Sequence, residues 1–215
     1  MKTCYIICAG TCENIDIEKN NDDLIIAADA GLNYCEKFDV IPDIVVGDFD
    51  SLGYVPENNE IIKLPVKKDD TDTSFAVRYA MDKGYSRFVV FGGTGGKRED
   101  HTFANIALLS YISKKGNVGF LVSDDYTITS ITDSRISFQS YMKGDISVFS
   151  FDEKAEGVTE KGLLYTLDNA VLKNSVPMGI SNSFIGQESF VSVANGTLII
   201  YYTGKFSDCT IDKFD

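Results

Sequence analysis

The chain has 215 residues, with 20 Lys and Arg against 32 Asp and Glu, and its formal net charge is −12. This acidic balance argues against nucleic acid as a partner, because binding a phosphate backbone needs a basic face. A composition of 44% hydrophobic and 24% charged residues is that of a globular protein, which excludes disordered and collagen-like classes. The apolar runs are far shorter than the ~18 residues of a membrane helix, and no signal peptide is indicated. We therefore expect a cytoplasmic protein with no membrane partner.

The first 125 residues alternate short β-branched runs with amphipathic or polar stretches, which is typical of a parallel sheet covered by helices. Two helices are predicted, from about residue 70 to Gly84 and from about residue 102 to Gly116, and each ends at a glycine suited to a left-handed cap. Six strands are expected, near residues 5–9, 24–28, 44–46, 61–64, 88–91 and 118–122.

After residue 125 the sequence alternates Thr, Ser, Val, Ile and Phe with Gly or Asn-Gly punctuation, which indicates antiparallel β structure. The clearest predicted hairpin joins residues 190–194 to 197–202 through Asn195-Gly196, since Asn-Gly supplies the positive φ angles of a type I′ turn. The change of pattern predicts two domains with a boundary near residues 124–134. The five cysteines form no C-x-x-C pair, so we expect reduced, mostly buried thiols.

Polar clusters follow four of the predicted strands, at the sheet edge where open parallel sheets bind ligands. They are Asp29-Ala30-Gly31, residues 47–51, residues 67–72 and residues 92–101. Carboxylates that hold Mg²⁺ beside Lys and Arg can clamp a nucleotide polyphosphate. Aspartates that only cap helices and make turns are the alternative, but that interpretation does not explain the mixture of acidic, basic and glycine residues.

Asp48 and Asp50 are spaced to direct two carboxylates to one point, which suits a hard divalent cation. Leu52 stands where an EF-hand needs a third oxygen ligand, so that motif is excluded. Leu52 also replaces the threonine of the D-x-D-x-T phosphatases, which disfavours a phosphoaspartyl mechanism.

The glycine turn at residues 92–96 lets backbone N–H groups approach an anion, and the helix after it adds a positive dipole end. It is neither a Walker A loop nor G-x-G-x-x-G, because Arg98 stands where each motif needs another residue. A tight connection between strand and helix would explain the glycines alone, but the adjacent Lys97 and Arg98 favour a phosphate-binding role for this loop. His101 is the only histidine, which excludes a His-based metal site and favours a structural or indirect nucleotide role.

Five motifs, taken together and in order, resemble thiamin pyrophosphokinase over nearly the whole chain. They are Ala28-Asp29-Ala30-Gly31, Pro42-Asp43 with residues 47–51, Lys68-Asp69-Asp70-Thr71-Asp72, Arg98-Glu99-Asp100-His101 and Gly179-Ile180-Ser181-Asn182. The resemblance implies a homodimeric enzyme that transfers the pyrophosphoryl group of ATP to thiamin with Mg²⁺, giving thiamin diphosphate and AMP. It also implies an α/β fold, with an N-terminal Rossmann-like parallel-sheet domain and a C-terminal antiparallel β-sandwich. Residues 1–126 would bind nucleotide and Mg²⁺, and residues 127–215 would bind thiamin and dimerise.

The resemblance also implies the site residues, in active sites that the two subunits share. The metal ligands would be Asp48, Asp50 and Asp72, and the catalytic carboxylates would be Asp29, Asp72 and Asp100. ATP would be bound by Thr94, Gly95, Gly96, Lys97, Arg98, Asp100 and His101. Thiamin would be bound by Asp72, Tyr165, Ser181 and Asn182. The sequence departs from the family pattern in having Ala30 where glycine is frequent and Tyr165 where some members have Trp.

Three alternatives stay open. A pyrophosphokinase acting on another hydroxymethyl heterocycle, such as a pterin, would keep the N-terminal motifs, but the segment at residues 179–182 argues against it. A nucleotide-binding regulator would be expected to lack part of the aspartate set, which is complete here. A Mg²⁺-dependent D-x-D phosphatase would act on phosphoesters without ATP.

Overall fold

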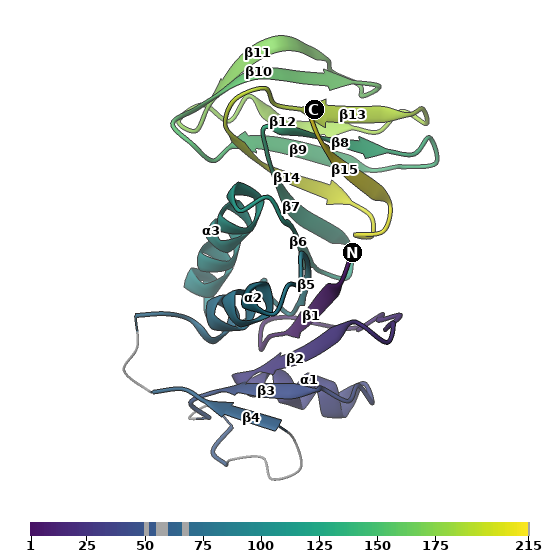
Figure 1. Cartoon of the computed structure of the whole chain (residues 1–215). Coiled ribbons are helices and arrows are strands. Elements are labelled where there is room, and N and C mark those ends of the chain that lie inside the picture. Colours follow the sequence, from purple (N-terminus) through teal and green to yellow (C-terminus); the bar gives the residue numbers. More distant parts are fainter. Residues whose placement is uncertain (50–51, 55–59, 66–68, 215) are drawn as a thin grey trace. The chain divides into compact units, whose positions relative to one another are not determined.

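The computed structural model describes residues 1–49, 52–54, 60–65 and 69–214, and the chain forms two compact units (Figure 1). The first unit comprises Met1–Asn105 and Leu121–Asp124, and the second comprises Ile106–Phe120 and Asp125–Asp215. Helix α3 (Glu99–Lys114) and strand β6 (Val118–Val122) each have residues in both units. The predicted division of function at residues 126 and 127 stays a prediction.

In the described part of the first unit, the strands β5-β1-β2-β3-β4 lie side by side in that order, and all neighbours are parallel. Most of these strands are rich in β-branched residues, which suit strands that are covered on both faces. Every residue of β1 is buried, and Ile6 lies between Ile26 and Val90 on the neighbouring strands. Their bounds are Thr3–Ile7 for β1, Leu24–Ala28 for β2, Ile44–Gly47 for β3, Glu60–Lys63 for β4 and Arg87–Phe91 for β5. The predicted parallel sheet is confirmed.

Helix α2 (Asp72–Asp82) packs on this sheet through Ala76, Val77 and Ala80, which are completely buried. Its N-terminus is capped by Thr71, whose hydroxyl oxygen accepts the Ser74 N–H at 3.1 Å. The short 3₁₀ turn Asp29–Gly31 and helix α1 (Leu32–Lys37) follow β2. Helix α1 was not predicted, because six residues are too few to show a helical period.

The strand order places a switch point between β1 and β5. The chain runs outward from β1 through β2 and β3 to β4, and then returns to add β5 on the other side of β1. The loops that leave the carboxyl ends of β1 and β5 therefore turn in opposite directions, and a crevice opens between them.

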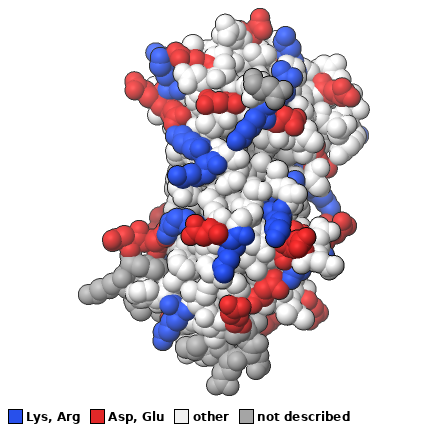
Figure 2. Space-filling model, viewed as in Figure 1, with Lys and Arg blue, Asp and Glu red and all other residues white. Residues whose placement is uncertain are grey.

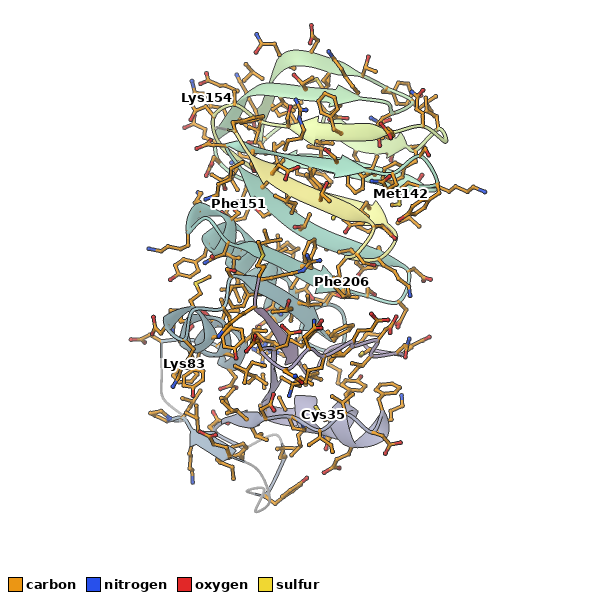
Figure 3. The ribbon with its side chains drawn as sticks, turned by 45° about the vertical axis from the view of Figure 1, so that its right-hand side comes forward. Cys35, Lys83, Met142, Phe151, Lys154 and Phe206 are labelled. Carbon is orange, nitrogen blue, oxygen red and sulfur yellow. The ribbon has the colours of Figure 1, made fainter. Side chains whose placement is uncertain are left out.

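The second unit contains two antiparallel groups of strands, β12-β9-β14-β7 and β11-β10-β13-β8-β15. The two groups pack face to face, since the ring of Phe138 on β8 lies 5.0 Å from that of Tyr202 on β14. The ring of Phe206, labelled in Figure 3, lies 6.0 Å from that of Phe120. The predicted antiparallel β-sandwich is confirmed. Bounds are Tyr126–Thr132 (β7), Ser134–Phe138 (β8), Asp145–Ser150 (β9), Lys154–Lys161 (β10), Leu167–Lys173 (β11), Gly179–Ser183 (β12), Ser189–Ser192 (β13), Thr197–Thr203 (β14) and Cys209–Lys213 (β15).

The predicted hairpin around Asn195-Gly196 is wrong. Strand β13 pairs with β8 and β10, whereas β14 pairs with β7 and β9, so the segment crosses from one sheet to the other. The Asn195 N–H donates to the Glu156 carbonyl oxygen at 3.1 Å, and the Gly196 N–H donates to Oδ1 of Asp133 at 2.8 Å. Burial decides the pairing, because the buried middle of β14 needs a neighbouring strand on each edge.

The charged side chains and the cysteines are placed as the composition led us to expect. In the view of Figure 2, acidic and basic side chains are interspersed. All five cysteines are free and buried, as predicted, including Cys35 on α1, which Figure 3 labels. Among the described residues, the helices are all too short or too polar to span a bilayer.

Candidate active site

A cleft of about 630 Å³ lies in the first unit, where the switch point places a crevice. Every residue that lines it belongs to this unit. The lining comes from the loop after β1, the ends of β2 and β5, and the starts of α1, α2 and α3. It comprises residues 8–13, Ala28, Asp29, Tyr34, residues 71–73, Gly92, Gly93, residues 95–98, His101 and Asn105.

The floor of the cleft consists of two backbone segments that stay paired beyond the ends of their strands. The Gly10 N–H donates to the Gly92 carbonyl oxygen and the Thr11 N–H to that of Thr94, both at 2.8 Å. A Cβ atom on Gly10 would lie 2.5 Å from the Gly92 oxygen, and one on Gly92 would lie 2.4 Å from the Cys8 oxygen. Only glycine allows this approach, so these glycines shape the cleft through packing.

The glycine turn is held by α3. The Gly95 N–H donates to Oγ1 of Thr102 at 3.0 Å, and Nδ2 of the buried Asn105 donates to the Gly93 carbonyl oxygen at 2.7 Å. In this conformation the Gly95 N–H is engaged within the protein. Anion binding at the turn therefore depends on the other N–H groups and on the exposed side chains of Lys97 and Arg98.

The N-terminus of α2 opens into the cleft. Thr71, Asp72 and Thr73 all line it, so the positive end of an 11-residue helix faces the same space as Lys97 and Arg98. Thr73 is fixed by its hydroxyl, which lies 3.2 Å from the Sγ atom of Cys8. Burial raises the pKa of Cys8 to about 12, so this thiol is protonated and contributes no charge.

Asp29 shows two features expected of a ligand-binding carboxylate. Its φ is 46°, in the left-handed region, and its Oδ1 atom is buried without a hydrogen-bond partner in the described part of the chain. A Cβ atom on Gly47 would lie 3.1 Å from the Cβ atom of Asp29, so the glycine makes room for it. An orphaned carboxylate oxygen on the cleft wall suits a cation or a donating ligand.

The predicted metal set is only partly visible. Asp72 lines the cleft, and Asp48 is half-buried directly after β3, beside Phe49 with a φ of 63°. Asp50 lies outside the described residues. Among those described, no three His, Cys, Asp or Glu side chains gather closely enough to hold a metal ion. The assignment of Asp48, Asp50 and Asp72 therefore stays a prediction.

Arg98 and Asp100 form an exposed pair at the start of α3. The Nε atom of Arg98 donates to Oδ1 of Asp100 at 2.9 Å, and Nη2 donates to Oδ2 at 2.7 Å. This hydrogen bonding lowers the pKa of Asp100 to about 2, which makes the carboxylate a weak base in this conformation. Lys97, Arg98 and His101 line the cleft, whereas Asp100 and Thr94 are not among the lining residues.

Three of the four predicted thiamin residues, Tyr165, Ser181 and Asn182, lie in the second unit, whereas Asp72 lies in the first. Tyr165 is 66% exposed, and Ser181, with a φ of 60°, donates its N–H to Oγ of Ser147 at 3.1 Å. Asn182 is buried and forms hydrogen bonds to the backbone of Tyr165. The structure thus brings Asn182 and Tyr165 together, and their contact with thiamin stays a prediction.

Sequence reasoning missed the loop after β1, Tyr34 and Asn105 as lining residues. The loop at residues 8–13 carries no cluster of charges, and it reaches the cleft only because of the strand order. Its one signal is Gly10-Thr11, two small residues directly after the strand expected at residues 5–9.

A parallel sheet with acidic and basic groups around its switch-point cleft, together with an antiparallel β-sandwich, defines an α/β protein of a kind suited to phosphoryl transfer. The model of the thiamin pyrophosphokinase catalytic domain matches residues 16–120, and that of the family's vitamin B1 binding domain matches residues 133–198. The chain belongs to the thiamin pyrophosphokinase family of enzymes, as its motifs predicted.

Individual relatives agree with this membership. A thiamine pyrophosphokinase of Bacillus subtilis is 29% identical, over 93% of this chain and 98% of its own length. A crystal structure of a Bacillus subtilis thiamine pyrophosphokinase matches with a TM-score of 0.81 and 26% identity, over 95% of this chain and 100% of that one. The Candida albicans thiamin pyrophosphokinase shares the fold, with a TM-score of 0.73 and 16% identity over 94% of this chain and 90% of its own.

Proposed function

We propose that the protein transfers the pyrophosphoryl group of ATP to thiamin, giving thiamin diphosphate and AMP, and that it requires Mg²⁺. The observation that carries this proposal is the cleft, in which the N-terminus of α2 and two basic side chains share one space with the carboxylates of Asp29 and Asp72. Family membership and the activity named for the Bacillus subtilis relative support the choice of substrates.

The phosphates of ATP bind between the N-terminus of α2 and the side chains of Lys97 and Arg98. Helix N-termini and cations both stabilise negative charge, which develops on the α-phosphate oxygen of AMP as its bond to the transferred group breaks. Thr94, Gly95, Gly96, Asp100 and His101 complete the proposed ATP site. Arg98 already holds Asp100, so Asp100 orients the guanidinium group toward the cleft.

The donors in and near the cleft fit a magnesium ion, which prefers carboxylate oxygens and keeps several of its waters. We assign its binding to Asp48, Asp50 and Asp72; when bound, it neutralises charge on the polyphosphate. Asp29 and Asp72 are the better placed of the proposed catalytic carboxylates to accept the thiamin hydroxyl proton, because both line the cleft, whereas Asp100 does not and is hydrogen-bonded to Arg98.

Thiamin binds to Tyr165, Ser181, Asn182 and Asp72, in a homodimer with shared active sites. The exposed Tyr165 ring offers a flat face to a cationic ring, an interaction worth about 0.5–2 kcal/mol. The acidic charge of the chain also attracts a cationic substrate.

One assay tests the function and its alternatives. The purified chain is incubated with ATP, MgCl₂ and thiamin, and AMP and thiamin diphosphate are separated by chromatography. We expect the two products in equal amounts, with no turnover when EDTA is added. A hydroxymethylpterin in place of thiamin tests the pterin alternative, and a phosphoester without ATP tests the phosphatase. Absence of thiamin-dependent AMP formation would refute the proposal.

A further inference from the structure

A buried carboxyl group lies next to the segment that carries Tyr165. Glu160, on β10, is 1% exposed, and its Oε2 atom accepts a hydrogen bond from Nδ2 of Asn182, on β12, at 2.9 Å. Both strands are in the second unit (Figure 1). We propose that Glu160 is a positioning residue for the thiamin site, which holds the Asn182 amide and through it the backbone of Tyr165. The role of Tyr165 in this inference rests on the proposed function.

The Asn182 amide has no spare hydrogen-bonding capacity. A carboxamide offers two N–H donors and two lone pairs on its oxygen. Oδ1 accepts the N–H groups of Tyr165 and Ser183, both at 2.9 Å, and Nδ2 donates to the Tyr165 carbonyl oxygen at 2.8 Å and to Glu160. Since Asn182 is only 4% exposed, loss of the Glu160 acceptor would leave a buried N–H without a partner.

Tyr165 is therefore held at both polar groups of its backbone by a single side chain. The two residues before Tyr165 pair with the two residues after Asn182. Leu163 forms an isolated β-bridge with Phe184, and the Leu164 N–H donates to the Ser183 carbonyl oxygen at 3.0 Å. The Tyr165 ring itself stays 66% exposed. An exposed ring on a fixed backbone binds a flat ligand with a smaller loss of conformational entropy.

Fold stability alone does not explain a carboxyl group at position 160. Burial raises the pKa of Glu160, and its Oε1 atom is buried without a hydrogen-bond partner among the residues that the structure describes. Burying a carboxyl group that keeps one oxygen unpaired costs desolvation free energy. Glu160 thus carries a desolvation cost while it supports the clamp on Tyr165, a combination expected near functional sites.

The test compares three variants of the full chain. Glu160→Met keeps a long unbranched side chain and removes the acceptor, and Glu160→Gln keeps an acceptor oxygen. Glu156→Gln is a control on the same strand, at a side chain that is 40% exposed. For Glu160→Met we expect the KM for thiamin to rise roughly three- to ten-fold, the range for one lost buried hydrogen bond. The KM for ATP should stay within about two-fold of wild type, because the proposed ATP site lies in the first unit. Glu160→Gln and Glu156→Gln should stay within about two-fold of wild type.

Amide hydrogen exchange of the Leu163–Tyr165 segment provides a readout that is independent of activity. In Glu160→Met the Tyr165 N–H should exchange roughly ten-fold faster, while core amides keep their protection. If Glu160→Met does not fold, Glu160→Ala takes its place in both measurements. An unchanged thiamin KM or an unchanged Tyr165 exchange rate overturns the inference. Failure of the wild-type chain to make thiamin diphosphate refutes the proposed function instead, and the exchange measurement still tests the clamp.

Discussion

Replacing Gly10 by Ala should distort the cleft and lower the catalytic rate while leaving the fold intact. The added Cβ would lie 2.5 Å from the carbonyl oxygens of both Gly92 and Thr94, about 0.9 Å short of an ordinary 3.4 Å contact. Both obstructing atoms are backbone, so the loop after β1 and the glycine turn must separate by nearly that distance. Misplacement of about 1 Å can cost 10²-fold in rate, or about 2.7 kcal/mol.

The assay for this prediction is the steady-state rate of AMP formation at varied ATP, with the melting temperature of each variant. Gly84→Ala is the matched control, because Gly84 has a φ of 85° and an added Cβ there would meet nothing within 4 Å. That substitution costs stability through backbone strain, of order 1 kcal/mol, and should leave kcat/KM for ATP unchanged. A Gly10→Ala enzyme within three-fold of the wild-type kcat/KM would refute the packing argument.

Three further predictions address charge, substrate and thiols. Asp72→Asn and Asp48→Asn should each lower kcat by roughly 10²-fold or more with an unchanged circular dichroism spectrum, and near-normal activity in both would contradict the metal assignment. Tyr165→Ala should raise the thiamin KM several-fold and leave the ATP KM nearly unchanged, whereas weaker ATP binding would disprove the assigned role. Because burial raises the pKa of Cys8 to about 12, little thiolate is present at pH 8. Cys8 should therefore resist alkylation by iodoacetamide in the native protein and react after unfolding. Mass spectrometry of the peptide that contains Cys8 measures the extent of alkylation.

Most elements of the first unit could be predicted, because parallel strands covered on both faces leave short runs of β-branched residues in the sequence. Strand β2 matches its expected range, and β1 begins two residues earlier than expected. The interpretation of Asn195-Gly196 as a hairpin failed for a physical reason. A turn signal reports local backbone preference, whereas the partners of β13 and β14 are decided by burial across the whole second unit.

The candidate site shows the same limit. Asp29, Asp72, Lys97 and Arg98 could be found because charged residues at strand ends are conspicuous in a sequence, and the cleft contains all four. The loop after β1 contributes mainly backbone and small side chains, so its part in the cleft follows from strand order, which local patterns do not encode. Asn182 was also found from the sequence; the structure adds that its amide is hydrogen-bonded to Tyr165, Ser183 and Glu160, and its contact with thiamin stays a prediction.

The crossing at Asn195-Gly196 has a consequence for synthesis of the chain. Strand β13 lies between β10 and β8 in one sheet, and β14 lies between β9 and β7 in the other. Both central places stay empty until residues 189–203 have left the ribosome, and a chain that stops before Ser189 leaves open strand edges in both sheets. The second unit therefore completes its fold only after residues 189–203 have been translated, and chains truncated or stalled before them are the species most exposed to aggregation.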